Sequence, residues 1–284
     1  MSERVDSVEG ADGYPLSVRR YEPQSRPSHQ FLLLHGVVSH AGWLAPIGKR
    51  LAARGIRLLA ADRRGAGRND QEVGDAPSVD ILIDDAFALL RHYQSDDCAT
   101  HFGGFCWGAT YALNVLERDR SGVASFVMIA PSIFPASDVG GAALEASDDA
   151  TARCIPNVPI DRFTQGPDYE EFIVPDPLRT RLVSPRFNQC MIDMNRLLAP
   201  RWAKLRMPTL MVLAEQDRLS DNEKHLRAWR HVRGVPKSHI MVPGEHGVQF
   251  DAPEQTVDSM VDWVSLVSGD TQLDAAIADV VTPA

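Results

Sequence analysis

The sequence predicts an α/β fold: a mostly parallel central sheet with helices on both faces and an inserted helical cap. Short apolar runs alternate with amphipathic stretches, as in the strand–helix units of parallel sheets. The 284 residues, 44% of them hydrophobic, suffice for one large domain that carries an insertion. Between residues 135 and 206 the alternation stops, and prolines, aromatic residues and helical fragments take its place.

The first half of the chain contains the clearest strand–helix units. Residues 14–21 alternate like an edge strand after the turn pair Asp12-Gly13. Continuous apolar runs predict buried strands, and helical spacing predicts amphipathic helices, one of them with Ser78 as its N-cap. The expected strands are 31–35, 56–61, 100–105 and 125–130, and the expected helices are 43–54, 78–94 and 107–118.

The second half completes the sheet after the irregular segment. Apolar runs predict strands at 209–214 and 238–242, and a closing helix at 253–267 begins with Pro253 in its first turn. We therefore expect a core made of residues 1–134 and 207–268, a helical cap of residues 135–206 and a C-terminal tail of residues 269–284.

Composition excludes several functional classes. A formal net charge of −9 and a pI of about 5.5 argue against nucleic acid as a partner. No apolar run has the length of a membrane span or the form of a signal peptide, so we expect a cytoplasmic protein that does not bind membranes. The four cysteines form no C-x-x-C pair, and no His/Cys cluster has zinc spacing. We expect neither a metal nor a bound cofactor.

One motif points to covalent catalysis. Residues 104–108 read Gly-Phe-Cys-Trp-Gly, a G-x-C-x-G pattern between an expected strand and an expected helix. The related G-x-S-x-G pattern places a nucleophile on a sharp strand-to-helix turn, where flanking side chains would collide with their neighbours. At the start of a helix, backbone N–H groups favour a thiolate. Cys106 is the candidate nucleophile; the alternative is a glycine stretch required for packing, with an inert buried cysteine.

Such a nucleophile needs an acid and a histidine after it in the chain. Asp217 follows the strand 209–214, and His246 lies on a glycine-flanked loop after the strand 238–242. Glu215 and Asp221 are the fallback acids. The alternatives are that His246 is an ordinary loop histidine and that Asp217 caps a helix or pairs with a loop cation.

Two backbone N–H groups complete the expected site. The loop after the strand 31–35 commonly supplies one donor to an oxyanion hole, and the residue after the nucleophile supplies the other. By position these donors are Val37 and Trp107. Because backbone groups donate, side-chain identity neither supports nor opposes the assignment.

Together these motifs resemble a known superfamily. The segments HGVVSHAGW, DRRGAGRND, GGFCWGA, AEQDRLS and GEHGVQF are similar to those of α/β-hydrolases, in the lysophospholipase or monoacylglycerol-lipase-like branch. That branch has serine where this chain has Cys106. Related proteins with cysteine there are the dienelactone hydrolases and the aminoacyl transferases of nonribosomal peptide pathways, of the coronamic-acid and syringomycin type. The size of the chain and its GFCWG elbow resemble the second group.

This resemblance implies an acyltransferase that moves an aminoacyl or acyl group between carrier-protein phosphopantetheine thiols through a Cys106 thioester. A thioester intermediate is nearly isoenergetic with thioester donor and product, so the group can pass in either direction. One alternative is a cysteine-nucleophile hydrolase of the thioesterase, esterase or dienelactone-hydrolase type. Another is a non-catalytic α/β-hydrolase-like binding protein, against which the complete triad argues.

The charge pattern of the expected cap suggests a partner. Residues 178–206 contain seven Lys or Arg but one acid, Asp193. A basic rim would steer acidic acyl or aminoacyl carrier proteins towards the site, so we expect Arg179, Arg181 and Arg186 to dock them. The alternative is a solvated amphipathic face.

Overall fold

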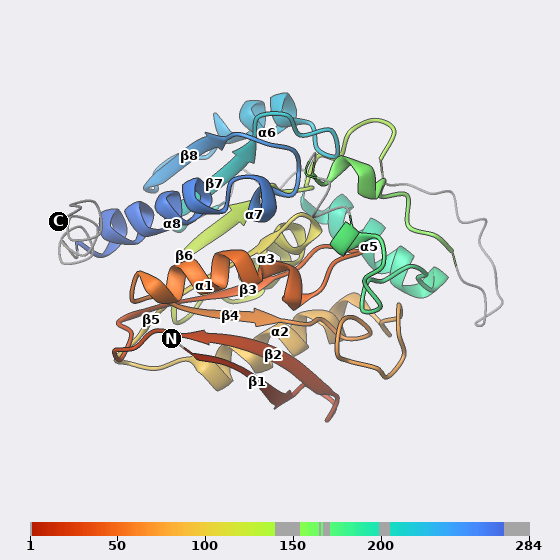
Figure 1. Ribbon diagram of the computed structural model, residues 1–284, viewed down its shortest axis with the longest axis horizontal. Coiled ribbons are helices and arrows are strands. Elements are labelled where there is room, and N and C mark those ends of the chain that lie inside the picture. Colours follow the sequence, from red (N-terminus) through yellow and green to blue (C-terminus); the bar gives the residue numbers. More distant parts are fainter. Residues whose placement is uncertain (1, 140–153, 165, 167–170, 199–204, 270–284) are drawn as a thin grey trace.

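The computed structural model describes residues 2–139, 154–164, 166, 171–198 and 205–269. Its eight strands form one sheet in the order β1-β2-β4-β3-β5-β6-β7-β8, parallel from β4 onwards and antiparallel at β1 and β2 (Figure 1). The strands are β1 Ser2–Glu9, β2 Pro15–Glu22, β3 His29–Leu34, β4 Arg57–Ala61, β5 Ala99–Phe105, β6 Val123–Ile129, β7 Thr209–Ala214 and β8 Lys237–Val242. The predicted α/β fold, an α/β-hydrolase architecture, is confirmed.

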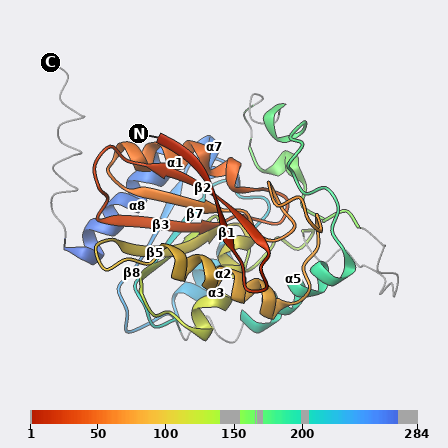
Figure 2. The same cartoon turned by 90° about the horizontal axis from the view of Figure 1, so that it is seen from below.

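Helices cover both faces of the sheet. Figure 2 shows α1, α7 and α8 on one side and α2 and α3 on the other. The described helices are η1 Ala41–Leu44, α1 Ala45–Ala53, α2 Val79–Tyr93, α3 Trp107–Arg118, η2 Ile160–Arg162, α5 Pro185–Leu198, α6 Asn222–Trp229, α7 Val248–Asp251 and α8 Pro253–Ser268. Ser78 caps α2 as predicted, because its hydroxyl accepts from the Ile81 N–H at 3.2 Å.

The edge of the sheet differs from the expectation. Residues 14–21 were expected to form an edge strand, but β2 is the second strand and β1 is the edge. The sequence of β1, SERVDSVE, has no apolar run; of its eight residues Val8 alone is buried. Backbone pairing with β2 and the cross-strand ion pairs Glu3–Arg19 and Asp6–Arg20, rather than burial of apolar side chains, therefore hold β1 in place.

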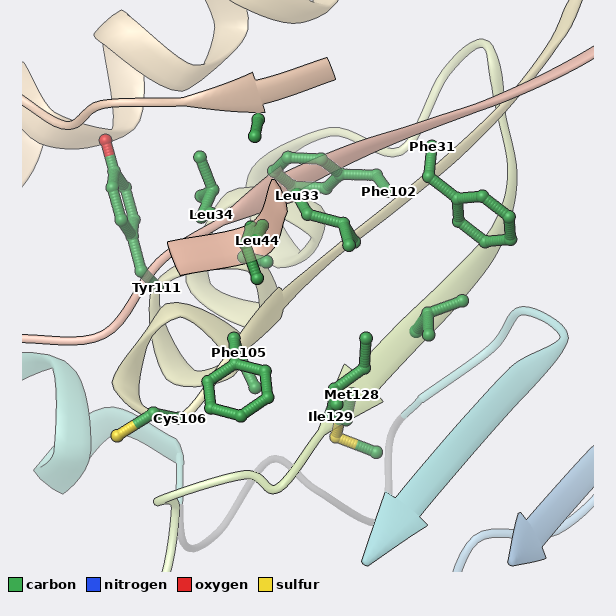
Figure 3. Packing of buried hydrophobic residues seen from close by; sticks show 14 of the residues in the cluster. Phe31, Leu33, Leu34, Leu44, Phe102, Phe105, Cys106, Tyr111, Met128 and Ile129 are labelled. Atoms are coloured by element: carbon green, nitrogen blue, oxygen red, sulfur yellow. The ribbon is translucent and has the colours of Figure 1, made fainter. Parts of the chain in front are cut away.

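The centre of the sheet is apolar on both faces. All six residues of β3 and all six of β7 are buried, as expected for parallel strands between two layers of helices. Figure 3 shows this packing: Phe102, Phe105 and Ile129 lie along β5 and β6, and Cys106 stands at the end of the row. The core therefore extends up to the candidate nucleophile and fixes the turn that carries it.

The segment between β6 and β7 lies beyond the carboxyl ends of the parallel strands (Figure 1). Its described part contains η2, α5 and an isolated bridge between Cys154 and Val183, and a second isolated bridge joins Pro135 to Ser220. Parts of the expected cap (140–153, 165, 167–170 and 199–204) and the expected tail after Gly269 lie outside the described residues. Within the part of the chain that the structure describes, no helix is long and apolar enough to cross a membrane.

Candidate active site

Cys106 sits on a strained turn between β5 and α3. Its backbone angles are φ 57° and ψ −128°, a region that non-glycine residues avoid and that costs on the order of 1–3 kcal/mol. The turn is held by hydrogen bonds on both sides: Cys106 N–H donates to the Ile129 carbonyl at 3.0 Å, and the Cys106 carbonyl accepts from Ala109 N–H at 3.1 Å. The side chain is only 5% exposed, and its sulfur points away from the Phe105 ring (Figure 3).

Glycines make this turn possible. A Cβ on Gly104 would lie 2.2 Å from the carbonyl carbon of Gly108, and one on Gly108 would lie 2.1 Å from the Leu34 oxygen. A Cβ on Gly36 would lie 2.9 Å from the Cβ of Cys106 and 3.1 Å from its sulfur. Three of these distances are below 3.0 Å, which a real Cβ essentially never shows, and the 3.1 Å distance to sulfur is tighter than usual. The chain therefore packs closely around Cys106.

Asp217 and His246 form a buried pair. His246 Nδ1 lies 3.0 and 2.9 Å from the two carboxylate oxygens of Asp217, and both side chains have no exposed surface. Because a carboxylate only accepts hydrogen bonds, we assign the proton to Nδ1. The N–H groups of Leu219 and Ser220 also donate to Asp217, at 2.8 and 2.9 Å. These contacts hold the carboxylate in one orientation.

The opposite side of the His246 ring faces Cys106. Nε2 is buried and has no partner among the described residues that meets the usual distance and angle of a hydrogen bond. Cys106 interacts with this ring by charge and by a weak side-chain hydrogen bond. Burial lowers the pKa of His246, but the interactions of the ring with Asp217 and with Cys106 outweigh burial and raise this pKa to about 10. The rings of Phe105 and Phe163 pack edge-on against the imidazole and keep it in place.

The two fallback acids lie elsewhere. Asp221 caps α6 by accepting from Lys224 N–H at 2.9 Å. Glu215 is exposed on the loop after β7. The structure thus brings Asp217, and neither Glu215 nor Asp221, into hydrogen bonding with His246.

The loop that contains Val37 is fixed from two directions. His35 is buried, which holds its pKa well below the ordinary value, so the ring is neutral. It links the carbonyl of Gly36 at 2.8 Å to the N–H of Arg63 at 3.1 Å. The Arg63 guanidinium donates to the Val37 carbonyl at 2.8 Å. These hydrogen bonds from Arg63 and His35 hold the loop at Val37 in one conformation.

A cavity of about 90 Å³ opens onto Cys106, and both Val37 and Trp107 line it. α5 contributes the stripe Asn188, Met191, Ile192 and Asn195, whose spacing of three and four residues places these side chains on one helical face. Sequence reasoning did not single out this stripe. The spacing is visible in the sequence, but nothing in it tells that the face meets Cys106.

The three arginines expected to dock a carrier protein have different surroundings. Arg186 forms an ion pair with Asp75. Arg181 donates to the carbonyls of Asp176 and Val174 at 2.8 and 3.1 Å. Arg179 lines a second cavity. Docking of an acidic carrier protein, with its phosphopantetheine arm, stays a prediction; Arg201 and Lys204 of the same basic stretch lie outside the described residues.

The segment after β6 is anchored to the core near this site. The Asp176 carboxylate accepts from His40 Nε2 at 2.9 Å and from Trp43 Nε1 at 2.6 Å. Thr180 N–H donates to the Val38 carbonyl at 3.0 Å. Among the described residues, no group of three or more His, Cys, Asp or Glu side chains is placed to hold a metal ion.

Comparison with known proteins identifies the family. The model of the family "Serine aminopeptidase, S33" matches residues 25–252. Monoacylglycerol lipase of Mycolicibacterium smegmatis is 23% identical over 277 residues, which cover 91% of this chain and 95% of that protein. An uncharacterized abhydrolase domain-containing protein of Dictyostelium discoideum is 29% identical over 147 residues, or 51% of this chain. The chain spans only 15% of the length of that second relative.

A solved structure shows the same fold. Monoglyceride lipase from Saccharomyces cerevisiae, in complex with a substrate analog, superposes with a TM-score of 0.79 at 14% identity. The match covers 97% of this chain and 96% of that one. At this identity the likeness concerns the fold alone.

These comparisons correct the predicted reaction. Transfer of an aminoacyl or acyl group between carrier-protein thiols is wrong, because two relatives that are named for an activity are a monoacylglycerol lipase and a phospholipase. The physical reason for the error is that a cysteine on a strand–helix turn indicates a candidate nucleophile but does not indicate which molecule would accept an acyl group from it. Which acceptor reaches the acyl-enzyme depends on the three-dimensional surroundings of the site. The matched family model covers most of the chain, and the chain belongs to the serine aminopeptidase S33 family of α/β-hydrolases.

Proposed function

We propose that this protein is a hydrolase of carboxylic esters that uses Cys106 as its nucleophile, His246 as its acid and base and Asp217 to orient His246. One observation carries the proposal. Asp217 binds Nδ1 of the buried His246 ring, and Nε2 of the same ring has no regular hydrogen-bond partner among the described residues. Cys106 interacts with this ring and occupies a strained strand–helix turn.

In the first half of the reaction the Cys106 sulfur attacks the ester carbonyl. A carbon–sulfur bond forms, and the carbonyl π electrons move onto oxygen. The N–H groups of Val37 and Trp107 are our candidates to stabilise this oxyanion, since both residues line the cavity at Cys106. As the oxyanion collapses, the carbon–oxygen bond to the alcohol breaks. The alcohol leaves with the proton from His246 Nε2, and Cys106 holds the acyl group as a thioester.

In the second half, water replaces the alcohol. His246, now neutral, takes a proton from water as the water oxygen attacks the thioester carbonyl. The carbon–sulfur bond breaks, the carboxylic acid leaves, and the thiolate–imidazolium pair is restored. The raised pKa of His246, about 10, supports this cycle. The imidazole stays protonated next to the Cys106 sulfur and can then donate this proton to the departing alcohol.

Two features suggest the substrate class. The relative from Mycolicibacterium smegmatis is named for monoacylglycerol, an ester of glycerol. The cavity at Cys106 measures about 90 Å³ and can take the part of the substrate next to the ester. A wider cavity of about 710 Å³ next to it can take the larger part.

We also propose that residues 135–206 act as a cap over Cys106. Hydrogen bonds fasten this segment to the core beside His246. Asp176 and Thr180 bond to the core, and the Phe163 carbonyl accepts a hydrogen bond from the Gly247 N–H. Side chains from this segment line the cavity at Cys106, among them Pro156, Val158 and Met191. Such a cover shields the thioester from bulk water.

The test is a panel of 4-nitrophenyl acyl esters, glycerol monoesters and acyl thioesters, assayed with the wild type and with Cys106→Ala. Cys98→Ala is the matched control, because Cys98 is also buried and directly precedes β5. We expect ester hydrolysis by the wild type and the control and at least a 10²-fold loss in Cys106→Ala. Full turnover by Cys106→Ala would refute the proposal, and turnover of thioesters alone would make the protein a thioesterase.

A further inference from the structure

We propose that Arg179 and Thr180 form an anion-binding site for a carboxylate or phosphate at the far end of the substrate. The site lies in the second cavity of about 710 Å³. The inference rests on the proposed ester hydrolysis, because it names the chemical class of that ester. Nothing in the sequence motifs or in the family match specifies this charge.

The second cavity adjoins the catalytic one. Residues Pro156, Asn157 and Val158 line both cavities. Val37 lines the catalytic cavity, and its neighbour Val38 lines the second. A single extended molecule can therefore have its ester at Cys106 and its far end in the second cavity.

Arg179 is the unusual cation of this region. Its Nε is buried and has no hydrogen-bond partner among the described residues, whereas Arg186 is paired with Asp75 and Arg181 with two carbonyls. A buried guanidinium nitrogen without an acceptor is costly. Burial and the like charge of Arg181 also lower the pKa of Arg179 and together outweigh the opposing effect of the Asp176 carboxylate. An anion bound there would therefore relieve an unfavourable environment.

Thr180 supplies a second unused group. It is 3% exposed, and its Oγ1 is buried without a partner in the described part of the chain. Its own N–H donates to the Val38 carbonyl at 3.0 Å, which fixes Thr180 next to the loop of the candidate oxyanion hole. Guanidinium and hydroxyl donors together suit an oxygen anion, which accepts several hydrogen bonds at once.

The other side chains of the cavity limit the rest of the ligand. Asp161 is the one carboxylate among the described lining residues, and it is exposed. Ile155, Pro156, Val158 and Leu182 make much of the wall apolar, and Ile155 and Leu182 are 74% and 47% exposed. The structure therefore favours an apolar chain that ends in an anion over a neutral or cationic molecule.

The experiment compares matched esters that differ only in terminal charge. The probes are the 4-nitrophenyl monoesters of adipic and suberic acid, their methyl-capped diesters, and a 4-nitrophenyl ester of a phosphorylated ω-hydroxy acid of the same length. The enzymes are the wild type, Arg179→Gln, Arg179→Lys and Thr180→Val. Arg227→Gln is the control, because Arg227 is exposed on α6 and paired with Glu223.

We expect the wild type and Arg227→Gln to prefer an anionic ester over its capped partner by roughly tenfold in kcat/KM. Arg179→Gln should lose this preference through a higher KM, Arg179→Lys should keep part of it, and Thr180→Val should weaken it. The carboxylate and phosphate probes show which anion is preferred. Equal rates on charged and capped esters in the wild type, or equal losses on both in Arg179→Gln, would overturn the site.

A binding measurement separates this inference from the proposed function. Monomethyl suberate is titrated by calorimetry into Cys106→Ala and into the double variant Cys106→Ala with Arg179→Gln. If no ester is turned over but binding needs Arg179, the anion site stands and the proposed hydrolysis fails. If esters are turned over but binding is absent or the same in both proteins, the anion site fails and the hydrolysis stands.

Discussion

His246 Nδ1 contacts both carboxylate oxygens of Asp217, at 2.9 and 3.0 Å, and neither side chain reaches solvent. The backbone N–H groups of residues 219 and 220 donate to Oδ1 of the same carboxylate. In such an arrangement the acid selects one tautomer of the histidine and directs Nε2 towards the nucleophile. The catalytic assignment can therefore be tested at Asp217 without touching Cys106.

Asp217→Asn keeps the shape of this side chain but turns one oxygen into a donor. The amide then disfavours the Nδ1–H tautomer, and we expect kcat/KM for ester hydrolysis to fall by about 10²- to 10⁴-fold. Asp221→Asn is the control, since asparagine also caps a helix and α6 should keep its start. Steady-state kinetics check both. Unchanged kinetics in Asp217→Asn, or an equal loss in Asp221→Asn, would remove Asp217 from the site.

The raised pKa of His246 predicts a pH dependence of stability. Its folded-state pKa of about 10 lies above the ordinary 6.5, so the folded chain binds this proton more tightly than the unfolded chain. The stabilisation is complete below pH 6.5 and is lost as pH rises through about 10. The difference in Tm between the wild type and His246→Gln should therefore become smaller as the pH rises from 6.5 to about 10. His231→Gln, at the surface, is the control; a difference that grows with pH would contradict the assignment.

Gly36 is predicted to be essential because of its distance from the nucleophile. In Gly36→Ala the new Cβ would lie 2.9 Å from the Cβ of Cys106 and 3.1 Å from its sulfur. We expect a displaced thiol and at least a tenfold loss in kcat. Gly55→Ala, where φ is +81° and no atom lies within 4 Å, should lose about 1 kcal/mol of stability and keep its kcat. Kinetics and urea unfolding of both variants separate the two effects, and normal kcat in Gly36→Ala would refute the predicted contact.

Asp176 is predicted to fasten the proposed cap. Asp176→Ala leaves the buried donors of His40 and Trp43 without their shared acceptor, so we expect a loss of about 1–3 kcal/mol in the free energy of unfolding. Limited proteolysis should then cut faster between β6 and β7. Asp138→Ala, which removes an exposed ion pair with Arg162 in the same segment, should change neither measurement. Equal effects of the two variants would mean that Asp176 has no special role there.

Much of the core could be predicted because its signals are local. Glycines mark the turn at Cys106, and apolar residues mark the helix 107–118 and the strand 209–214. The structure has this helix and this strand with the predicted bounds. The contact between residues 217 and 246 follows from the parallel sheet, since β7 and β8 are neighbours and both loops leave their carboxyl ends.

Other features carry no such signal. β1 is held by backbone pairing with β2 and shows no apolar pattern. α6, with a strongly polar sequence, and the four-residue α7 were not predicted either. The stripe from Asn188 to Asn195 meets Cys106 only through the fold of the segment between β6 and β7. The reaction was misjudged for a similar reason, because a sequence motif gives the candidate nucleophile but not the three-dimensional surroundings that select the acceptor.

The most direct test of the account is to trap the acyl-enzyme. The wild type is mixed with 4-nitrophenyl butyrate, quenched at short times, and examined by intact-mass and peptide mass spectrometry. The account predicts a butyryl adduct on Cys106 that forms during the burst of 4-nitrophenol and then decays to butyric acid at the steady-state rate. Steady release of 4-nitrophenol with no adduct on Cys106, or with an adduct on another residue, would contradict it.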